Sequence, residues 1–202
     1  LQASFQGTGE HSGYKILGID PAAGGDNSAI VLRSGNLQQI MFNQKLRDTM
    51  DLVGVIQDIV REYRVDFLTI DKTGIGQGVF DRLKQMDYPI RGVSFGEKSE
   101  DPMFANLKAE WHWRQRQWLL SGGRLVQDHG WNEFEIVKYK NKDGKIIIQP
   151  KEELFREGIG SPNVVDAAVL TQCISDTAIK NSRIVRQAGG SFQDKMLDVW
   201  RT

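Results

Sequence analysis

The sequence predicts an α/β fold: a mixed sheet of five or more strands flanked by helices, with an additional β-hairpin. Three short apolar strands separated by turns open the chain, which is typical of an antiparallel meander. Strand and helix patterns then alternate over residues 51–95, which indicates parallel strands joined by helical crossovers. Further along, Asp143 and Gly144 separate two lysine-rich strands, and this dipeptide favours a two-residue hairpin turn.

The first half of the chain supplies most of the predicted sheet. One helix is expected over residues 51–64, because its apolar side chains recur at i, i+3 and i+4, with Asp48 or Thr49 available as the N-cap. A second helix, residues 74–86, begins in a glycine-rich turn. The strands that surround these helices are expected at residues 14–20, 28–33, 38–46, 66–71 and 90–95.

The second half is mainly helical. A long helix is expected over residues 103–120, where Trp111 and Trp118 share a face with Leu107 and are predicted to pack in the core, whereas Trp113 lies off that face. The remaining elements are a hairpin of residues 136–139 with 145–149, a short helix over 151–157 after Pro150, and an apolar helix that begins at Ser161 and Pro162 and continues through Cys173.

Composition limits the possible partners. The chain has 202 residues, with 26 basic and 26 acidic side chains, and this balance argues against binding nucleic acid through bulk charge. A single cysteine, Cys173, cannot form an internal disulfide, which favours a reducing, intracellular setting. No segment approaches the length of a membrane span, so no membrane partner is expected.

One main domain is predicted, over residues 13–179. Residues 1–12 are rich in glycine, serine and glutamine without periodicity and are interpreted as a linker. Residues 180–202 are interpreted as a flexible polar tail, ending in a small amphipathic stretch over residues 192–200 that could dock on a partner.

Three acids stand at the ends or starts of apolar elements: Asp20, Asp71 and Asp166. For one acid alone, a polar strand end is the ordinary explanation. Together, on parallel neighbours and a helix that crosses their edge, they predict a site for two divalent ions, Mg²⁺ or Mn²⁺, because these ions prefer oxygen ligands. Asp26 is an auxiliary metal candidate, and Lys72 is placed to neutralise a substrate phosphate.

Positive charge is concentrated in the predicted hairpin. Four lysines are candidates for DNA contacts, although a solvated hairpin tip explains such a run equally well. These residues are Lys138, Lys140, Lys142 and Lys145.

An ordered set of motifs over roughly residues 14–175 resembles the nuclease domain of tailed-phage large terminase subunits. The set begins with Ile19-Asp20-Pro21-Ala22 and with Ile70-Asp71 followed by Gly74-Ile75-Gly76-Gln77-Gly78. It continues with Lys138-Tyr139, Gly144-Lys145 and Pro150-Lys151-Glu152-Glu153-Leu154. It ends with Ser161-Pro162-Asn163-Val164-Val165-Asp166-Ala167, where the family commonly has an aspartate at position 163.

The resemblance implies an RNase H-like fold and a two-metal endonuclease that cuts concatemeric double-stranded viral DNA during genome packaging. It implies that Asp20, Asp71 and Asp166 are the metal ligands, with Asp26 as an auxiliary, and that the hairpin lies near the active site. The implied partners are a terminase ATPase domain, the small terminase subunit and the portal protein. The implied location is the cytoplasm of the infected bacterial host, outside the mature virion.

Other functions remain open on the sequence alone. The chain contains no Gly-x-x-x-x-Gly-Lys-Ser/Thr phosphate loop, so we expect the ATPase motor to be a separate part of a longer protein. A junction resolvase or a ribonuclease H uses similar acids on the same fold, although no reader of a 2′-hydroxyl is identifiable. A non-catalytic DNA or portal docking module is the third alternative, with Phe192, Met196, Leu197 and Trp200 as docking residues.

Overall fold

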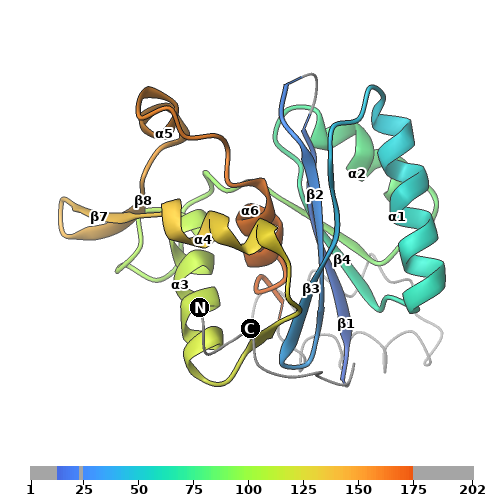
Figure 1. Ribbon diagram of the computed structural model, residues 1–202, viewed down its shortest axis with the longest axis horizontal. Helices are drawn as coiled ribbons and strands as arrows, with labels where there is room; N and C mark the ends of the chain where they lie inside the picture. The colour runs from blue at the N-terminus through green and yellow to red at the C-terminus, as the bar shows by residue number, and fades with distance from the viewer. Residues whose placement is uncertain (1–12, 23–24, 175–202) are drawn as a thin grey trace.

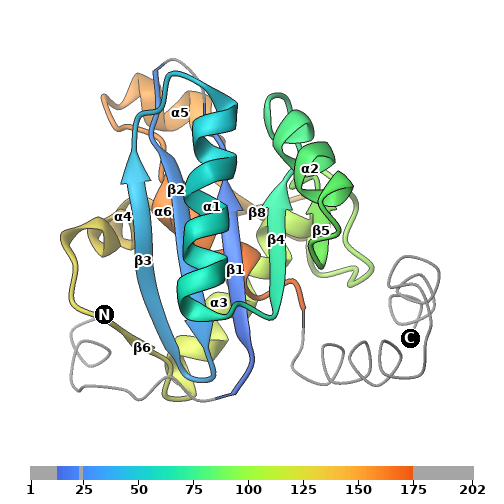
Figure 2. The ribbon, with the colours of Figure 1, turned by 90° about the vertical axis from the view of Figure 1, so that its right-hand side faces the viewer.

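The computed structural model describes residues 13–22 and 25–174, and a six-stranded mixed sheet forms its centre (Figure 1). The strand order is β5-β4-β1-β2-β3-β6, with β1, β2 and β3 antiparallel and the other neighbours parallel (Figure 2). This confirms the predicted mixed sheet. The strands are β1 (Lys15–Asp20), β2 (Ser28–Ser34), β3 (Leu37–Gln44), β4 (Phe67–Asp71), β5 (Ile90–Val93) and β6 (Arg124–Leu125).

Helices cover both faces of the sheet. Helices α1 (Thr49–Tyr63) and α2 (Gly76–Gln85) cover one face, while α6 (Asn163–Leu170) lies against the other, with α3 (Leu107–Leu120) outside it (Figure 1). Because successive residues of a strand point to opposite faces, β1 contributes Leu17 and Ile19 to the core under α1 and Ile16 to the core under α6. A strand buried on both sides explains the unbroken apolar run.

Helix α1 begins and ends where its capping chemistry indicates. The side chain of Asp48 accepts a hydrogen bond of 2.8 Å from the backbone N–H of Met50, which confirms one of the two predicted N-caps. At the other end Arg64 adopts the left-handed conformation, with φ of 53°, and closes the helix.

Helix α3 begins at Leu107, so the prediction that it begins at residue 103 is wrong. The preceding residues form turns and bends around an isolated bridge to the hairpin: the N–H of Ala105 bonds to the oxygen of Ile146 at 3.0 Å, and the N–H of Ile146 bonds to the oxygen of Met103 at 2.8 Å. Asn106 then caps the helix by accepting from the N–H of Ala109. Pairing with the hairpin therefore replaces the first helical turn.

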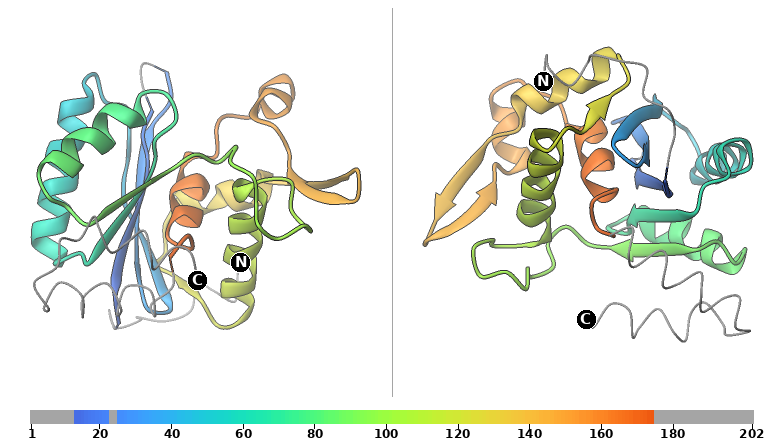
Figure 3. Two further views of the ribbon diagram at one scale, coloured as in Figure 1. Left: turned by 180° about the vertical axis from the view of Figure 1, so that it is seen from behind. Right: turned by 90° about the horizontal axis from the view of Figure 1, so that it is seen from below.

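The predicted hairpin is present as β7 (Tyr139–Lys142) and β8 (Lys145–Ile148) and projects away from the sheet (Figures 1 and 3). Its turn is the predicted one, because Asp143 and Gly144 both have positive φ, 52° and 76°. The predicted start at residue 136 is wrong, since Ile136 belongs to a short helix, α4 (Glu133–Ile136).

The remaining short elements are η2 (His129–Asn132), which no sequence pattern predicted, and α5 (Lys151–Arg156), which follows Pro150 as expected. Among the described residues, no helix is long and apolar enough to cross a membrane. The predicted linker, residues 1–12, and the predicted tail, residues 180–202, lie outside the described residues.

One glycine sets the distance between β1 and α6. A Cβ atom on Gly18 would lie 2.0 Å from the backbone oxygen of Ala167, much closer than any real contact. Only glycine therefore lets α6 lie directly on the strand that ends in Asp20, at Ala167, the residue after Asp166.

Candidate active site

Asp20 and Asp71 end neighbouring strands at the same edge of the sheet. Strands β1 and β4 are parallel, and Ile19 lies opposite Ile70, so the two aspartates occupy the next position on each strand. The carboxyl ends of both strands point upward in Figure 2. Asp71 is half-buried, and its Oδ1 accepts a hydrogen bond of 2.9 Å from the N–H of Thr73. The predicted pairing of these acids at one edge is therefore present.

Asp166 lies in the first turn of α6 and is completely buried. The start of this helix is held by Glu133 of α4, whose Oε2 accepts hydrogen bonds from the N–H groups of Val164 at 2.7 Å and Val165 at 3.3 Å. Glu133 thus replaces the missing side-chain cap of α6 and fixes the turn that presents Asp166.

Three basic side chains surround the Asp166 carboxylate. The Nζ atom of Lys108 lies 2.9 Å from each carboxylate oxygen, and the Nζ of Lys151 lies 3.2 Å from Oδ2. His112, one helical turn after Lys108 on α3, places Nε2 3.4 Å from Oδ1. Lys108 also lies over the ring of Phe95, with Nζ 5.1 Å from its centroid, which fixes the ammonium in place.

These contacts decide the charge states of the group. Burial alone would raise the pKa of Asp166, but Lys108, the hydrogen bond with His112 and Lys151 together hold that pKa well below its ordinary value. Burial lowers the pKa of His112 despite its contact with Asp166, so the ring is neutral at neutral pH. The pKa of Lys151 is raised, because Asp166 and Asp20 outweigh the opposing effect of burial. Asp166 is therefore an ionised carboxylate between two charged lysines.

Asp20 has the opposite environment. It is only 6% exposed, and no hydrogen bond or ion pair from a described residue reaches its carboxylate. Burial, and then the negative charge of Asp166, raise the pKa of Asp20 to about 8, against the smaller opposing effects of Lys151 and Lys108. Asp71 adds a further small rise. Asp20 is thus a buried acid whose charge lacks a partner.

The donor set at this edge fits a divalent cation. Asp20 and Asp71 offer hard oxygen ligands, and a cation would supply the positive charge that the buried Asp20 lacks. Within residues 13–22 and 25–174, no three His, Cys, Asp or Glu side chains form a ready-made metal cluster. Asp166 is instead engaged by the lysines, and its part in holding a cation remains a prediction.

The two auxiliary candidates lie at the margin of the site. Asp26 is exposed in the turn before β2, and its charge contributes to the raised pKa of Lys151, which places it within electrostatic reach. Lys72 follows Asp71 directly, is half-buried, and has Nζ 3.8 Å from a carboxylate oxygen of Glu97. Neither residue contacts Asp166.

Three of the four candidate DNA-binding lysines belong to the hairpin, and the fourth, Lys138, directly precedes it. Lys138 and Lys142 are exposed, Lys145 is half-buried, and Lys140 forms an ion pair with Glu153 of α5. The hairpin therefore presents several cations to solvent on the same side of the sheet as α3 and α5 (Figure 3).

The chain is similar in structure to solved nuclease domains of phage large terminase subunits. The nuclease domain of the large terminase subunit gp2 of bacterial virus Sf6 matches with a TM-score of 0.71 at 17% identity, covering 82% of this chain and 90% of that one. The chain has the fold of a terminase nuclease domain. A mutant of the same Sf6 domain with manganese and beta-thujaplicinol gives 0.71 at 18% identity, covering 82% and 90%.

A second terminase nuclease shows the same fold. The large terminase nuclease from thermophilic phage G20c with bound magnesium matches with a TM-score of 0.59 at 15% identity, covering 80% of this chain and 82% of that one. No protein-family model and no curated protein matches the sequence. The predicted RNase H-like architecture, a mixed sheet with helices on both faces, is confirmed.

Sequence reasoning missed the basic residues around Asp166 and the cap of its helix. Lys108 and His112 have i, i+4 spacing, which places both on one face of α3, and this is the one signal that could have indicated a shared target. Nothing in the spacing of Lys151 or Glu133 indicates their contacts, because these form only when α4 and α5 fold over the start of α6.

Proposed function

We propose that this chain is a divalent-metal-dependent endonuclease that cuts concatemeric double-stranded DNA during viral genome packaging. The observation that carries the proposal is the buried, uncompensated Asp20 beside Asp71 at one edge of a terminase nuclease fold. Two neighbours with this fold are described with manganese or magnesium, which supports Mg²⁺ or Mn²⁺ as the metal. When bound, two such ions activate a water molecule and stabilise the leaving oxygen of a phosphodiester.

Each residue of the site has a proposed part. Asp20 and Asp71 hold the ions, with Asp166 as the third ligand and Asp26 as an auxiliary. Lys108 and Lys151 keep Asp166 ionised and oriented, and His112 limits its rotation. These contacts fix the buried carboxylate before substrate arrives, which reduces the reorganisation that catalysis requires.

The DNA contacts and partners follow from the same proposal. The candidate lysines of the hairpin, with Lys72, contact phosphates and position the duplex without reading its sequence. We propose that the partners are double-stranded DNA, a terminase ATPase domain, the small terminase subunit and the portal protein, in the cytoplasm of an infected bacterial host. Because the chain carries no net charge, its own affinity for DNA is expected to be weak.

Cleavage of supercoiled plasmid tests the proposal. The purified chain is incubated with Mn²⁺, with Mg²⁺ or with EDTA, beside the variants Asp20→Asn and Asp71→Asn. We expect nicking and linearisation with either metal, no cleavage in EDTA, and loss of cleavage in both variants. Cleavage that persists in both variants would exclude this site as the active centre, and inactivity of the native chain with both metals would favour a docking module.

A further inference from the structure

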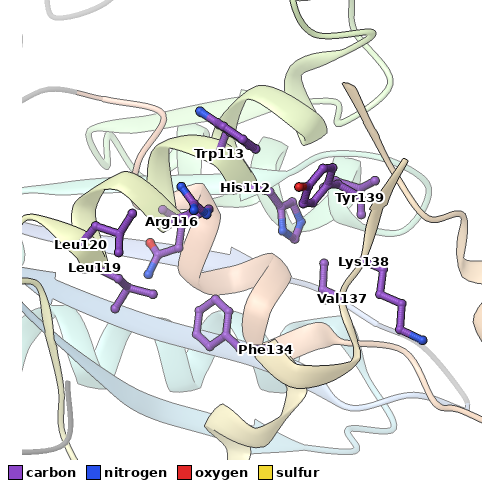
Figure 4. Close-up of a pocket in the computed structure, with 11 residues that line it drawn as sticks. His112, Trp113, Arg116, Leu119, Leu120, Phe134, Val137, Lys138 and Tyr139 are labelled. Carbon is purple, nitrogen blue, oxygen red and sulfur yellow. The ribbon is translucent and has the colours of Figure 1, made fainter. Parts of the chain in front are cut away.

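A cavity of about 300 Å³ lies between α3, the segment after α4 and the hairpin (Figure 4). Aromatic and aliphatic side chains form much of its wall, including Trp113 and Leu119 from α3, Phe134 from α4, and Tyr139 from β7. Its volume lies at the lower end of the range for small-ligand pockets, roughly 300–1,000 Å³. Tyr139 is 62% exposed, so the cavity opens to solvent beside the hairpin.

The cavity shares a wall with the proposed active site. His112 lines the cavity, and Nε2 of the same ring lies 3.4 Å from Oδ1 of Asp166. Figure 4 shows the imidazole at the end of the cavity nearest Tyr139. A group bound in the cavity would therefore be separated from Asp166 by one side chain.

The polar residues of the wall are suited to an anionic ligand. Arg116 and Lys138 line the cavity, both are exposed, and none of the described lining residues is acidic. Lys138 also leads directly into the lysine-rich hairpin. An apolar cavity with cations at its edge is complementary to a ligand that has both a flat apolar group, which would enter the cavity, and a phosphate, which would pair with the cations.

The aromatic rings of the wall are held in place by one another. Trp113 meets Tyr139 edge to face, with ring centroids 5.8 Å apart, and Phe104 lies 6.2 Å from Trp113. The guanidinium of Arg116 lies 5.2 Å from the centroid of Trp113. Aromatic rings and arginine planes that are fixed in this way are the usual platforms for stacking unpaired nucleobases.

We propose that this cavity receives one unstacked nucleobase from the DNA strand that enters the active site. The inference rests on the proposed nuclease function, and it assigns the aromatic wall to the base and the cations to the adjoining phosphates. An apolar peptide would use the same wall but would gain nothing from Arg116 and Lys138. Unstacking is least costly at a bulged or mismatched position, so the base would be taken most readily there.

Binding of a labelled DNA duplex with one bulged thymine tests the inference. The comparison is an identical duplex whose bulge is abasic, and fluorescence anisotropy is measured in EDTA so that no strand is cut. We expect the native chain to bind the thymine bulge about tenfold more tightly than the abasic bulge. Tyr139→Ala should abolish this preference, whereas the control Phe155→Ala, at a residue 53% exposed outside the cavity, should keep it.

The inference would be overturned if the native chain bound both duplexes with equal affinity, or if Tyr139→Ala kept the preference for the thymine bulge. It would also be overturned if a peptide of residues 192–200 displaced the DNA probe from the native chain but not from Tyr139→Ala. Plasmid cleavage by the same preparations keeps the two proposals separate. A chain that cuts with Mn²⁺ but shows no base preference excludes only the base cavity. A chain that prefers the thymine bulge but never cuts excludes the nuclease and keeps the cavity as the base-binding site of a docking module.

Discussion

Replacing Asp20 by asparagine should stabilise the metal-free protein above neutral pH. The carboxyl is buried without a partner, and its pKa rises from 3.8 to about 8. Because the folded state holds this proton more tightly than the unfolded state, stability falls as pH rises from about 4 to about 8 and then levels off. At pH 7 the accumulated loss is roughly 4 kcal/mol, from 1.36 kcal/mol per pKa unit.

Asparagine keeps the size of the side chain and removes the titration. At pH 8.5 the accumulated loss is roughly 5–6 kcal/mol. The buried amide of asparagine costs roughly 1–3 kcal/mol if it stays unpaired, so the net gain of Asp20→Asn at this pH should be about 2–5 kcal/mol. At pH 4, close to the ordinary pKa of the carboxyl, the native chain has lost little of this stability, so the gain should disappear. Mn²⁺ at 100 times its Kd should remove about 2.7 kcal/mol of this advantage, because it stabilises the native chain by that amount and the variant not at all.

Urea unfolding followed by the fluorescence of the five tryptophans measures these differences. Midpoints are compared at pH 4 and pH 8.5, with EDTA or with Mn²⁺. The control is Asp87→Asn, at an exposed position whose φ of 58° asparagine accepts readily. The reasoning would be refuted if Asp20→Asn were less stable than the native chain at pH 8.5 in EDTA. It would also be refuted if the stability of the native chain were the same at both pH values.

Three further predictions test the surroundings of the site. Gly18→Ala should cost about 3 kcal/mol or more in urea unfolding, because its Cβ would meet a backbone oxygen of α6 at 2.0 Å, whereas Gly54→Ala, with open space around it, should not destabilise. Burial raises the pKa of Glu133 to about 7, so the free energy of unfolding of the native chain falls between about pH 4.5 and pH 7. Glu133→Gln removes this titration and should raise the thermal midpoint more at pH 8 than at pH 5. Equal changes at both pH values would exclude the raised pKa of Glu133. Lys142→Gln should reduce the magnitude of the slope of log K against log salt concentration by about 1, where K is the association constant for duplex DNA. An unchanged slope, or the same reduction in Lys84→Gln on α2, would exclude the hairpin from the DNA interface.

The sequence was sufficient for the elements whose signals are local. The apolar run before Asp20 and the helical periodicity after Asp48 predicted β1 and α1 closely, and Asp143-Gly144 predicted the hairpin turn. Asp20 and Asp71 could be paired in advance, because parallel neighbouring strands must end at one edge. In each case the physical cause lies within a few residues of the pattern.

Elements that depend on distant partners were not predictable in this way. The residues before Leu107 have helical periodicity but pair with Ile146, so long-range hydrogen bonds override the local preference. The two-residue strand β6 carries too little pattern to detect, and it forms only because β3 offers a free edge. The contacts of Lys151 with Asp166 arise in the same way, from the folding of α5 over α6.

The charges of the site favour a cation at Asp20. The site holds three carboxylates, Asp20, Asp71 and Asp166, but only two lysines, Lys108 and Lys151, and both lysines form ion pairs with Asp166. One negative charge therefore remains without a balancing cation beside the buried Asp20. Only a proton or a further cation can neutralise that charge without opening the fold to water. Below about pH 8 the proton suffices, which accounts for the raised pKa of Asp20. A divalent cation that displaces this proton would turn the Asp20 carboxylate into a ligand, so metal binding should release close to one proton at pH 7. Titration calorimetry with Mn²⁺ in buffers of different ionisation enthalpy measures that number directly, and a value near zero would show that the metal binds without Asp20.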